Sequence, residues 1–245
     1  LFGAEDMANA VMVRPFAGRI NVDPEAKAAL DAWAVHGYSD GVNPQPTSGG
    51  AGVWSNVGKV GKGIGKPVWM TETSGFGDTW HGAMGTAASL HLALTQGRVS
   101  LWTWWSIRGL YTDGGFTLPG GASRHFYQHI PHNAVRIGAC CADSALAVSA
   151  YHVEDGRVLV VVLLNPTAEQ KEAVLQGDGV PAMEGRVSTA HASWSAISPM
   201  SVGQTFAVPD SSITTLYGGP YEPALGVAAA GLSRNESRLR RPTAI

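Results

Sequence analysis

The segment that decides the fold is Lys66–Ser74, which reads KPVWMTETS and is followed by Gly75. Its apolar part has the length and composition of a buried strand, and this strand ends directly in the carboxylate of Glu72. Catalytic residues of α/β barrels lie at the carboxyl ends of the strands, where the loops to the helices begin. Strand alternation predicts that Val68, Met70 and Glu72 share one face. We therefore expect Glu72 to point into the mouth of a barrel; the alternative is a surface glutamate that caps the next helix.

Strands and helices alternate on both sides of this segment, which is typical of βαβ units with a parallel sheet. Asp23-Pro24-Glu25 is a good helix start, because it combines an N-cap, a proline at the first helical position and an early acid. Asp78 is most simply the N-cap of its helix. The predicted strands are residues 1–4, 34–38, 66–71 and 99–107, and the predicted helices are residues 24–33, 53–61, from Asp78 or Thr79 to 96, and from the cap Ser123 to 130.

After residue 133 the pattern changes to short strands that follow one another closely, which suggests a small antiparallel β-sandwich. We expect this domain to span residues 133–217 and a flexible tail with four arginines to span residues 218–245. Glu154-Asp155-Gly156 is predicted to be a hairpin turn. The predicted strands are residues 135–137, 146–153, 157–164, 173–175, 185–191, 205–208 and 213–217.

The composition excludes several classes of protein. The chain has 245 residues, with 17 Lys+Arg against 19 Asp+Glu, a balance that argues against a nucleic-acid binder. Its longest apolar run, Val158–Leu164, has the length of a strand and is too short to span a membrane. The two cysteines, Cys140 and Cys141, are adjacent, so they indicate no disulfide framework. Because the chain starts at Leu1 with no signal-peptide pattern, we expect it to begin partway through a longer protein or to have lost its front to processing.

Two further strand ends carry side chains that suit carbohydrate chemistry. His36 and Tyr38 share a face of the predicted strand 34–38, where a tyrosine hydroxyl can orient a carboxylate and a histidine can bind a sugar hydroxyl. Trp102, Trp104 and Trp105 crowd the predicted strand 99–107, and aromatic rings stack on the apolar faces of sugars. The alternative for all of these residues is ordinary packing in the core or in loops.

The sequence gives little support to a metal site or to another catalytic class. His125 and His129 stand four residues apart with no acid nearby, so we expect no metal there. The chain has no Gly-x-Ser-x-Gly elbow, phosphate loop or dinucleotide fingerprint, and we expect no cofactor.

Taken in order, His36-x-Tyr38, Lys66–Ser74 and Val99–Trp105 resemble the second half of the catalytic barrel of glycoside hydrolase family 30. That family includes glucosylceramidases, glucuronoxylanases and β-1,6-glucanases. The passage from Pro131 to Ile137 and the segments Val160–Thr167 and Phe206–Leu216 are similar to the family's β-sandwich region. The resemblance covers roughly residues 1–217, and the Trp-x-Thr-Glu-x-Ser pattern is its most specific part.

This resemblance implies the second half of a (β/α)8 barrel in residues 1–132, followed by the sandwich. It also implies a secreted or extracytoplasmic retaining enzyme that acts on a β-linked glycan, with Glu72 as nucleophile. His36 and Tyr38 would line the sugar subsite, and a tryptophan of the 102–105 group would stack beneath it.

The family's acid/base glutamate follows an asparagine on the fourth strand, and this chain has no such segment before Glu72. Glu5, on the strand that matches the family's fifth, is not expected to replace it, so we expect this chain alone to be inactive. The alternative is a non-catalytic carbohydrate-binding or interaction protein derived from a glycosidase.

Overall fold

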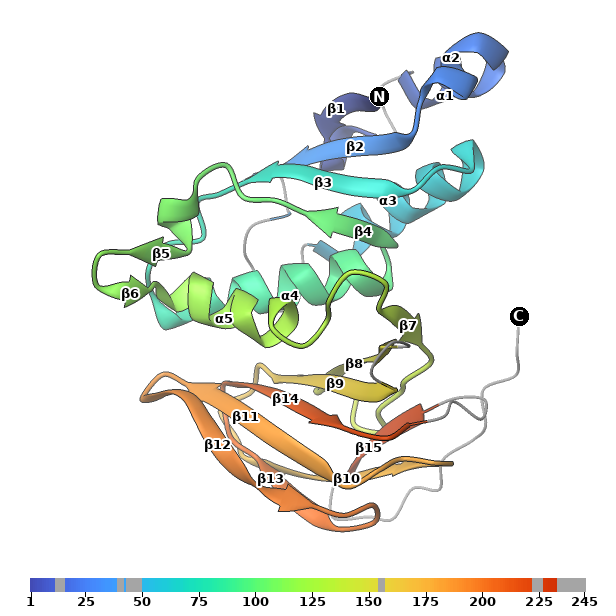
Figure 1. The fold of residues 1–245 in the computed structure, drawn as a ribbon. Coiled ribbons are helices and arrows are strands. Elements are labelled where there is room, and N and C mark those ends of the chain that lie inside the picture. Colours follow the sequence, from blue (N-terminus) through green and yellow to red (C-terminus); the bar gives the residue numbers. More distant parts are fainter. Residues whose placement is uncertain (12–15, 39–41, 43–49, 154–156, 222–226, 233–245) are drawn as a thin grey trace. The chain divides into compact units, whose positions relative to one another are not determined.

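The computed structural model describes residues 1–245 except 12–15, 39–41, 43–49, 154–156, 222–226 and 233–245 (Figure 1). The chain divides into two compact units, Leu1–Gly120 and Gly121–Ile245. The predicted turn Glu154–Gly156 and the arginines of the predicted tail lie outside the described residues.

Unit 1 is built on a four-stranded sheet with the order β1-β2-β3-β4, in which all neighbouring strands are parallel. The strands are β1 (Phe2–Met7), β2 (Ala32–Gly37), β3 (Val68–Thr73) and β4 (Val99–Trp102). The helices between them are η1 (Ala8–Ala10), α1 (Phe16–Val22), α2 (Pro24–Ala29), α3 (Gly50–Ile64) and α4 (Trp80–Thr95). After β4 come η2 (Ile107–Gly109), the small hairpin β5 (Tyr111–Thr112) and β6 (Gly115–Phe116), and α5 (Leu118–Tyr127). The predicted alternation of strands and helices is confirmed.

Helix starts in unit 1 follow from side chains that satisfy free backbone N–H groups. Asp23 accepts hydrogen bonds from the amides of Glu25 and Ala26, as the sequence predicts. The helix that it caps ends at Ala29, and Trp33, which was expected at the end of that helix, lies in β2 instead. Thr79, not Asp78, caps α4, because its hydroxyl accepts from the amide of Gly82. Asp78 accepts from the amide of Leu118, at the start of α5.

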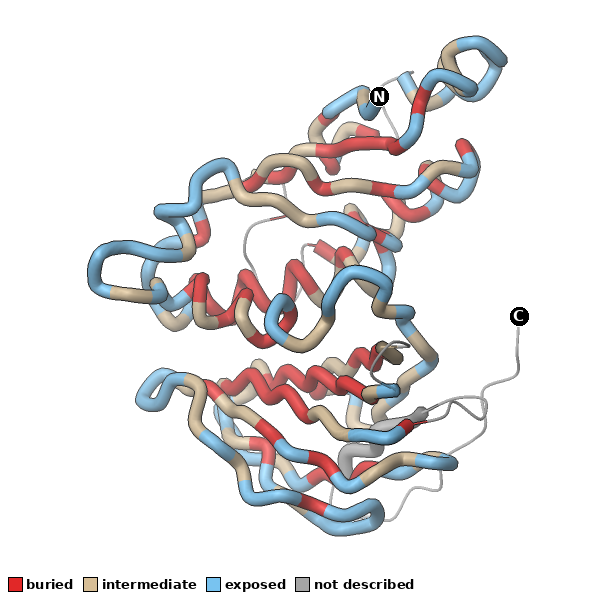
Figure 2. The backbone as a smooth tube through the Cα atoms, in the orientation of Figure 1, coloured by how far each residue is buried: buried red, intermediate tan, exposed pale blue. Residues whose placement is uncertain are grey.

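The prediction that Val68, Met70 and Glu72 share a face was wrong. Val68 and Met70 pack in the core between the sheet and α3, together with Trp54 and Val35. The β2–β3 pairing shifts register after Val35↔Met70, and the next pair is His36↔Glu72. One extra residue in β3 turns Glu72 to the other face of the sheet, which it shares with His36. Figure 2 shows buried positions running along β2 and α4.

Unit 2 contains two antiparallel sheets that share one hydrophobic core. The six-stranded sheet has the order β12-β11-β14-β9-β8-β7, and the three-stranded sheet has the order β13-β10-β15. The strands are β7 (Val135–Ile137), β8 (Ala147–Val153), β9 (Val158–Asn165), β10 (Lys171–Gly177), β11 (Met183–Thr189), β12 (Ala192–Met200), β13 (Thr205–Val208), β14 (Ser212–Gly218) and β15 (Val227–Leu232). Leu163 of β9, Leu175 of β10 and Leu216 of β14 are among the residues of the shared core.

Three expectations for this region differ from the structure. β12 was not predicted; its apolar residues alternate with serines, and it contains Pro199. β15 lies inside the range expected to be a flexible tail, where it pairs with β10. The boundary between the units falls at Gly120, earlier than residue 132, because His125 of α5 is hydrogen-bonded to strands of unit 2. Ser123 is therefore a buried residue inside α5 and not its cap.

Candidate active site

The strand ends of β2 and β3 bring three predicted site residues together. The hydroxyl of Tyr38 donates a hydrogen bond to Oε1 of Glu72. Nδ1 of His36 lies 3.7 Å from the same oxygen. His36 and Tyr38 reach the carboxylate from one strand end, as their spacing predicts, and Glu72 reaches them from the next. Both neighbours contact the same carboxylate oxygen, Oε1.

Tyr38 is held as a neutral hydrogen-bond donor. Burial raises the pKa of Tyr38 to about 12, and the hydrogen bond to Glu72 and the charge of that carboxylate act in the same direction. A neutral hydroxyl beside a carboxylate can orient it without competing for its charge. This arrangement suits a carboxylate that has to stay ionised and fixed in direction.

Glu5, which was not expected at the site, is a fourth side chain that reaches it. Oε1 of Glu5, in β1, lies 3.3 Å from Nε2 of His36. The imidazole therefore lies between two carboxylates that come from the strands on either side of its own. The sequence offered one signal for Glu5, because it directly follows the predicted strand 1–4, as Glu72 directly follows the predicted strand 66–71.

The three tryptophans occupy three different environments. Trp102 packs against Trp54 of α3, with ring centroids 5.8 Å apart, beside the core that the helices cover. It was expected at the sugar subsite, but its place on the helix side of the sheet removes it from the site. Trp104 packs against Phe76, with centroids 5.3 Å apart. Trp105 is 68% exposed, and its amide bonds to the carbonyl of Thr73 beside Glu72.

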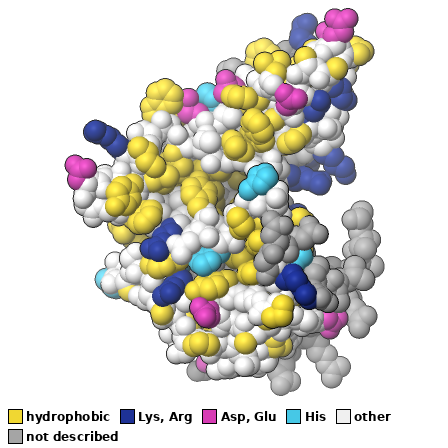
Figure 3. Space-filling view, viewed as in Figure 1, with side chains coloured by type: hydrophobic (Ala, Val, Ile, Leu, Met, Phe, Trp, Pro, Cys, Tyr) yellow, Lys and Arg dark blue, Asp and Glu magenta, His cyan; other side chains and the backbone are white. Residues whose placement is uncertain are grey.

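Further exposed apolar side chains follow Trp105 in the chain. Ile107, Tyr111 and Phe116 are all exposed, and the rings of Tyr111 and Phe116 meet edge to face. In Figure 3, hydrophobic side chains gather over the region of β5 and β6. Exposed aromatic and apolar groups of this kind can contact sugar rings.

His125 and His129 take part in packing within unit 2. The ring of His125 is fully buried and contacts the hydroxyls of Thr215 and Ser188 at 2.9 and 2.8 Å. His129 stacks on Tyr217, with centroids 4.0 Å apart. Within the part of the chain that the structure describes, no group of three or more His, Cys, Asp or Glu side chains is placed to hold a metal ion. The same part contains no helix long and apolar enough to cross a membrane.

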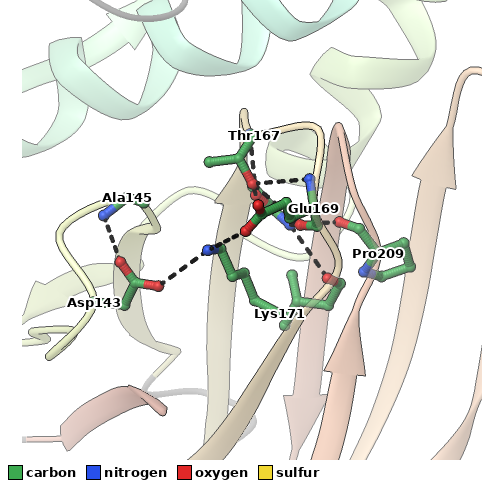
Figure 4. A network of polar contacts seen from close by, with 8 residues as sticks. Asp143, Ala145, Thr167, Glu169, Lys171 and Pro209 are labelled. Carbon is green, nitrogen blue, oxygen red and sulfur yellow. Dashed lines mark hydrogen bonds and ion pairs between the residues drawn. The ribbon is translucent and has the colours of Figure 1, made fainter. Parts of the chain in front are cut away.

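A second polar network, in unit 2, connects chain turns (Figure 4). The buried Asn165 donates to the carbonyls of Glu169 and Pro209 at 2.9 and 2.8 Å. Nζ of Lys171 lies 3.3 Å from a carboxylate oxygen of Glu169 and 3.8 Å from one of Asp143. The side-chain amide of Asn165 bonds to backbone carbonyls. This network therefore stabilises the turns of unit 2.

Several known proteins resemble this chain in sequence or in fold. No known family model matches the sequence. The chain is 30% identical over 165 residues to the glucuronoxylanase XynC of Bacillus subtilis (strain 168), covering 63% of this chain and 37% of that protein. Its fold is similar to a GH30 endoxylanase from Clostridium papyrosolvens C71, at a TM-score of 0.74 and 21% identity, over 89% of this chain and 55% of that one. It is also similar to a conserved exported protein from Bacteroides fragilis, at a TM-score of 0.67 and 16% identity, over 88% of this chain and 54% of that one.

A parallel α/β unit with a carboxylate, a tyrosine and a histidine at its strand ends, followed by an antiparallel β unit, has the architecture of a glycoside hydrolase. The particular resemblance that the motifs indicate is confirmed: in sequence the chain is similar to a glucuronoxylanase, and in fold it is similar to about half of a family 30 endoxylanase. It spans about two fifths of the curated relative and about half of the solved structures.

Proposed function

We propose that this chain is the nucleophile-bearing part of a retaining glycoside hydrolase that acts on a β-linked glycan of the xylan type. In this proposal the sheet of unit 1 is the second half of a (β/α)8 barrel, and unit 2 is the β-sandwich that follows it. The observation that carries the proposal is the contact of Tyr38 and His36 with Glu72 at adjacent strand ends. The names of the glucuronoxylanase and endoxylanase relatives supply the substrate class.

Glu72 is the nucleophile in this mechanism. Tyr38 and His36 both contact Oε1, so Oε2 attacks the anomeric carbon and forms the covalent glycosyl-enzyme. A retaining enzyme also needs an acid/base carboxyl about 5–5.5 Å from the nucleophile, which first protonates the leaving oxygen and then activates water. We propose that this second carboxyl lies on polypeptide outside this chain, and that the chain alone therefore performs no turnover.

The remaining aromatic groups complete the sugar subsite. Trp105 is the proposed stacking platform, because its ring is exposed and its backbone is bonded to the strand end that follows Glu72. Trp104, packed on Phe76, supports the loop that presents it. We also propose an extracytoplasmic location, on the description of the Bacteroides fragilis relative as an exported protein.

Covalent trapping tests the nucleophile without requiring turnover. A 2-deoxy-2-fluoro-β-xylobioside with a dinitrophenolate leaving group needs no proton from an acid, and fluorine slows hydrolysis of the intermediate. Incubation of the chain with this reagent, followed by peptide mass spectrometry, should place one sugar on Glu72. Glu72→Gln should carry no label, and Glu25→Gln, which removes an exposed carboxylate from α2, should be labelled like the wild type. A wild-type chain that stays unlabelled at saturating reagent would refute the nucleophile assignment.

Carbohydrate binding without hydrolysis is the second candidate. It is favoured by the exposed rings of Trp105, Tyr111 and Phe116, which could stack on sugars without any reaction at Glu72. This candidate predicts measurable binding of xylotriose together with no label on Glu72. The labelling experiment therefore distinguishes the two functions, because only the hydrolase should carry a sugar on Glu72.

A further inference from the structure

The position of His36 between two carboxylates is more specific than the proposed function requires. Nε2 lies 3.3 Å from Oε1 of Glu5, and Nδ1 lies 3.7 Å from Oε1 of Glu72. The first distance allows a hydrogen bond, whereas the second is longer than one. The imidazole thus has one bonded edge, toward Glu5, and a second edge that lies beside Glu72.

The backbone of β1 is shaped to present Glu5 to this ring. The β1–β2 register runs through Ala4↔Ala34 and then shifts to Asp6↔Val35, which leaves Glu5 as an extra residue. With an unbroken register Glu5 would oppose Val35, whose side chain lies in the core under the helices. Glu5 also has a φ of 55°, a conformation that costs a residue with a side chain about 1 kcal/mol or more. Bulges of this kind often redirect a side chain next to an active site.

We propose that Glu5 is a positioning residue of the sugar subsite, an inference that rests on the proposed function. Its carboxylate accepts the Nε2–H of His36, which fixes the rotation of the ring and leaves Nδ1 without a proton. Nδ1 and Oε1 of Glu72 are then two neighbouring acceptors, and a sugar hydroxyl that donates to Nδ1 is held next to the nucleophile. The structure thus assigns His36 the role of accepting a hydrogen bond from the substrate. It assigns Glu5 the role of determining which ring nitrogen of His36 carries the proton.

A role in stability alone accounts for these contacts less well. The side chain of Glu5 is 45% exposed, and an ion pair or hydrogen bond at that exposure contributes little to stability. An orienting hydrogen bond to a second ring nitrogen, by contrast, decides which nitrogen carries the proton. The expected consequence of losing Glu5 is a change in the His36 tautomer.

The tautomer can be measured directly in this chain. Long-range ¹H–¹⁵N spectra of the histidine rings, recorded at alkaline pH and assigned with His36→Gln, should show the proton of His36 on Nε2. Glu5→Leu removes the acceptor, so the proton should move to Nδ1, from which it can donate to Glu72. Glu5→Gln keeps an acceptor oxygen and should restore the Nε2–H form. Glu25→Leu, the same substitution on α2, should leave the spectrum unchanged.

A binding measurement separates this inference from the proposed function. Glu5→Leu should weaken xylotriose binding about tenfold, the loss of roughly one hydrogen bond, and Glu5→Gln should recover most of that loss. A proton on Nδ1 in the wild type, or an Nε2–H tautomer that survives in Glu5→Leu, would overturn the role of Glu5. A wild-type chain that neither binds xylotriose nor labels at Glu72 would instead refute the proposed function, while the spectra would still decide the role of Glu5. If Glu5→Leu fails to fold, the spectrum of Glu5→Ala decides.

Discussion

His36 in unit 1 and His125 in unit 2 show how differently the two units treat the same side chain. His36 lies at a strand end between two carboxylates, and its ring is partly exposed. His125 is fully buried, and its ring nitrogens contact two neutral hydroxyls. Burial lowers the pKa of His125 to about 3, with smaller contributions in the same direction from His129 and Arg124. Charged partners at an accessible edge leave a ring available to a ligand, whereas neutral partners in a closed core use the ring for stability.

The contrast extends to the other polar groups of the two units. The polar groups of unit 1 that we propose for the sugar site come from β1, β2 and β3 or directly follow β2. In unit 2 the buried Asn165 bonds to backbone carbonyls, and the buried ring of His125 bonds to the hydroxyls of Thr215 and Ser188. Substitutions of these groups should therefore affect ligand binding in unit 1 and unfolding in unit 2.

The largest effect is expected at Asn165. Its amide nitrogen donates to the carbonyls of Glu169 and Pro209, and its oxygen accepts from the amide of Thr167. Asn165→Leu would remove these hydrogen bonds and the one that its oxygen accepts from the Thr167 hydroxyl, although Ser212 still donates to the Pro209 carbonyl. At about 1 kcal/mol for each bond lost, the substitution should lower the free energy of unfolding by about 3–4 kcal/mol. Urea unfolding checks this value, with Gln176→Leu, at an exposed amide of β10, as the control. A loss below about 1 kcal/mol would show that solvent satisfies the freed groups.

The next effect is a pH dependence of stability that His125 confers on unit 2. The folded pKa of about 3 lies below the ordinary value of 6.5, so the unfolded chain takes up the proton first. The contribution of His125 is complete above about pH 6.5 and is lost as the pH falls toward about 3, at about 1.4 kcal/mol per unit.

Urea unfolding at several pH values measures this slope. Between about pH 6.5 and 4.5 the wild type should lose about 2–3 kcal/mol more than His125→Gln loses over the same range. His132→Gln, at an exposed histidine, should keep the wild-type slope. Equal slopes for the wild type and His125→Gln would mean that the buried ring does not control acid stability.

Substitutions of Trp102 and of Trp105 should separate effects on stability from effects on sugar binding within unit 1. Trp102→Ala removes a ring that packs on Trp54 and should lower the free energy of unfolding by about 2–3 kcal/mol. Trp105→Ala should leave the melting temperature unchanged, because the ring is exposed, and should weaken xylotriose binding by about 1–3 kcal/mol. Calorimetry on both variants measures both quantities. An exchange of the two effects would move the sugar platform from Trp105 to Trp102.

The sequence allowed the site to be located better than it allowed faces to be assigned. His36, Tyr38 and Glu72 could be brought together because the carboxyl ends of parallel strands meet at one edge of a sheet. The extra residues in β1 and β3 have no signature in composition, yet each reverses the alternation that follows it. For that reason Glu72 was assigned to the face of Met70, and the turn of Glu5 toward His36 could not be foreseen. Glu5 had been considered only as an acid/base residue, and it was set aside because its strand matches the family's fifth. β15 was missed because its identity as a strand depends on pairing with β10, a long-range contact.

The smallest expected effect concerns two tyrosines whose pKa values are raised for different reasons. Tyr38 and Tyr151 both have a pKa of about 12, with burial as the largest cause in each. At Tyr38 the hydrogen bond to Glu72 and its charge add to burial, whereas at Tyr151 the interactions with Ser149 and Arg136 oppose it. Glu72→Gln should therefore lower the pKa of Tyr38 toward its ordinary value of 10.0 without reaching it, and should leave the pKa of Tyr151 unchanged. Ring-labelled ¹³C tyrosine spectra at alkaline pH, assigned with Tyr38→Phe and Tyr151→Phe, follow both residues in one sample. An unchanged Tyr38 would show that burial alone sets its pKa, and the contact with Glu72 would then be too weak to orient a nucleophile.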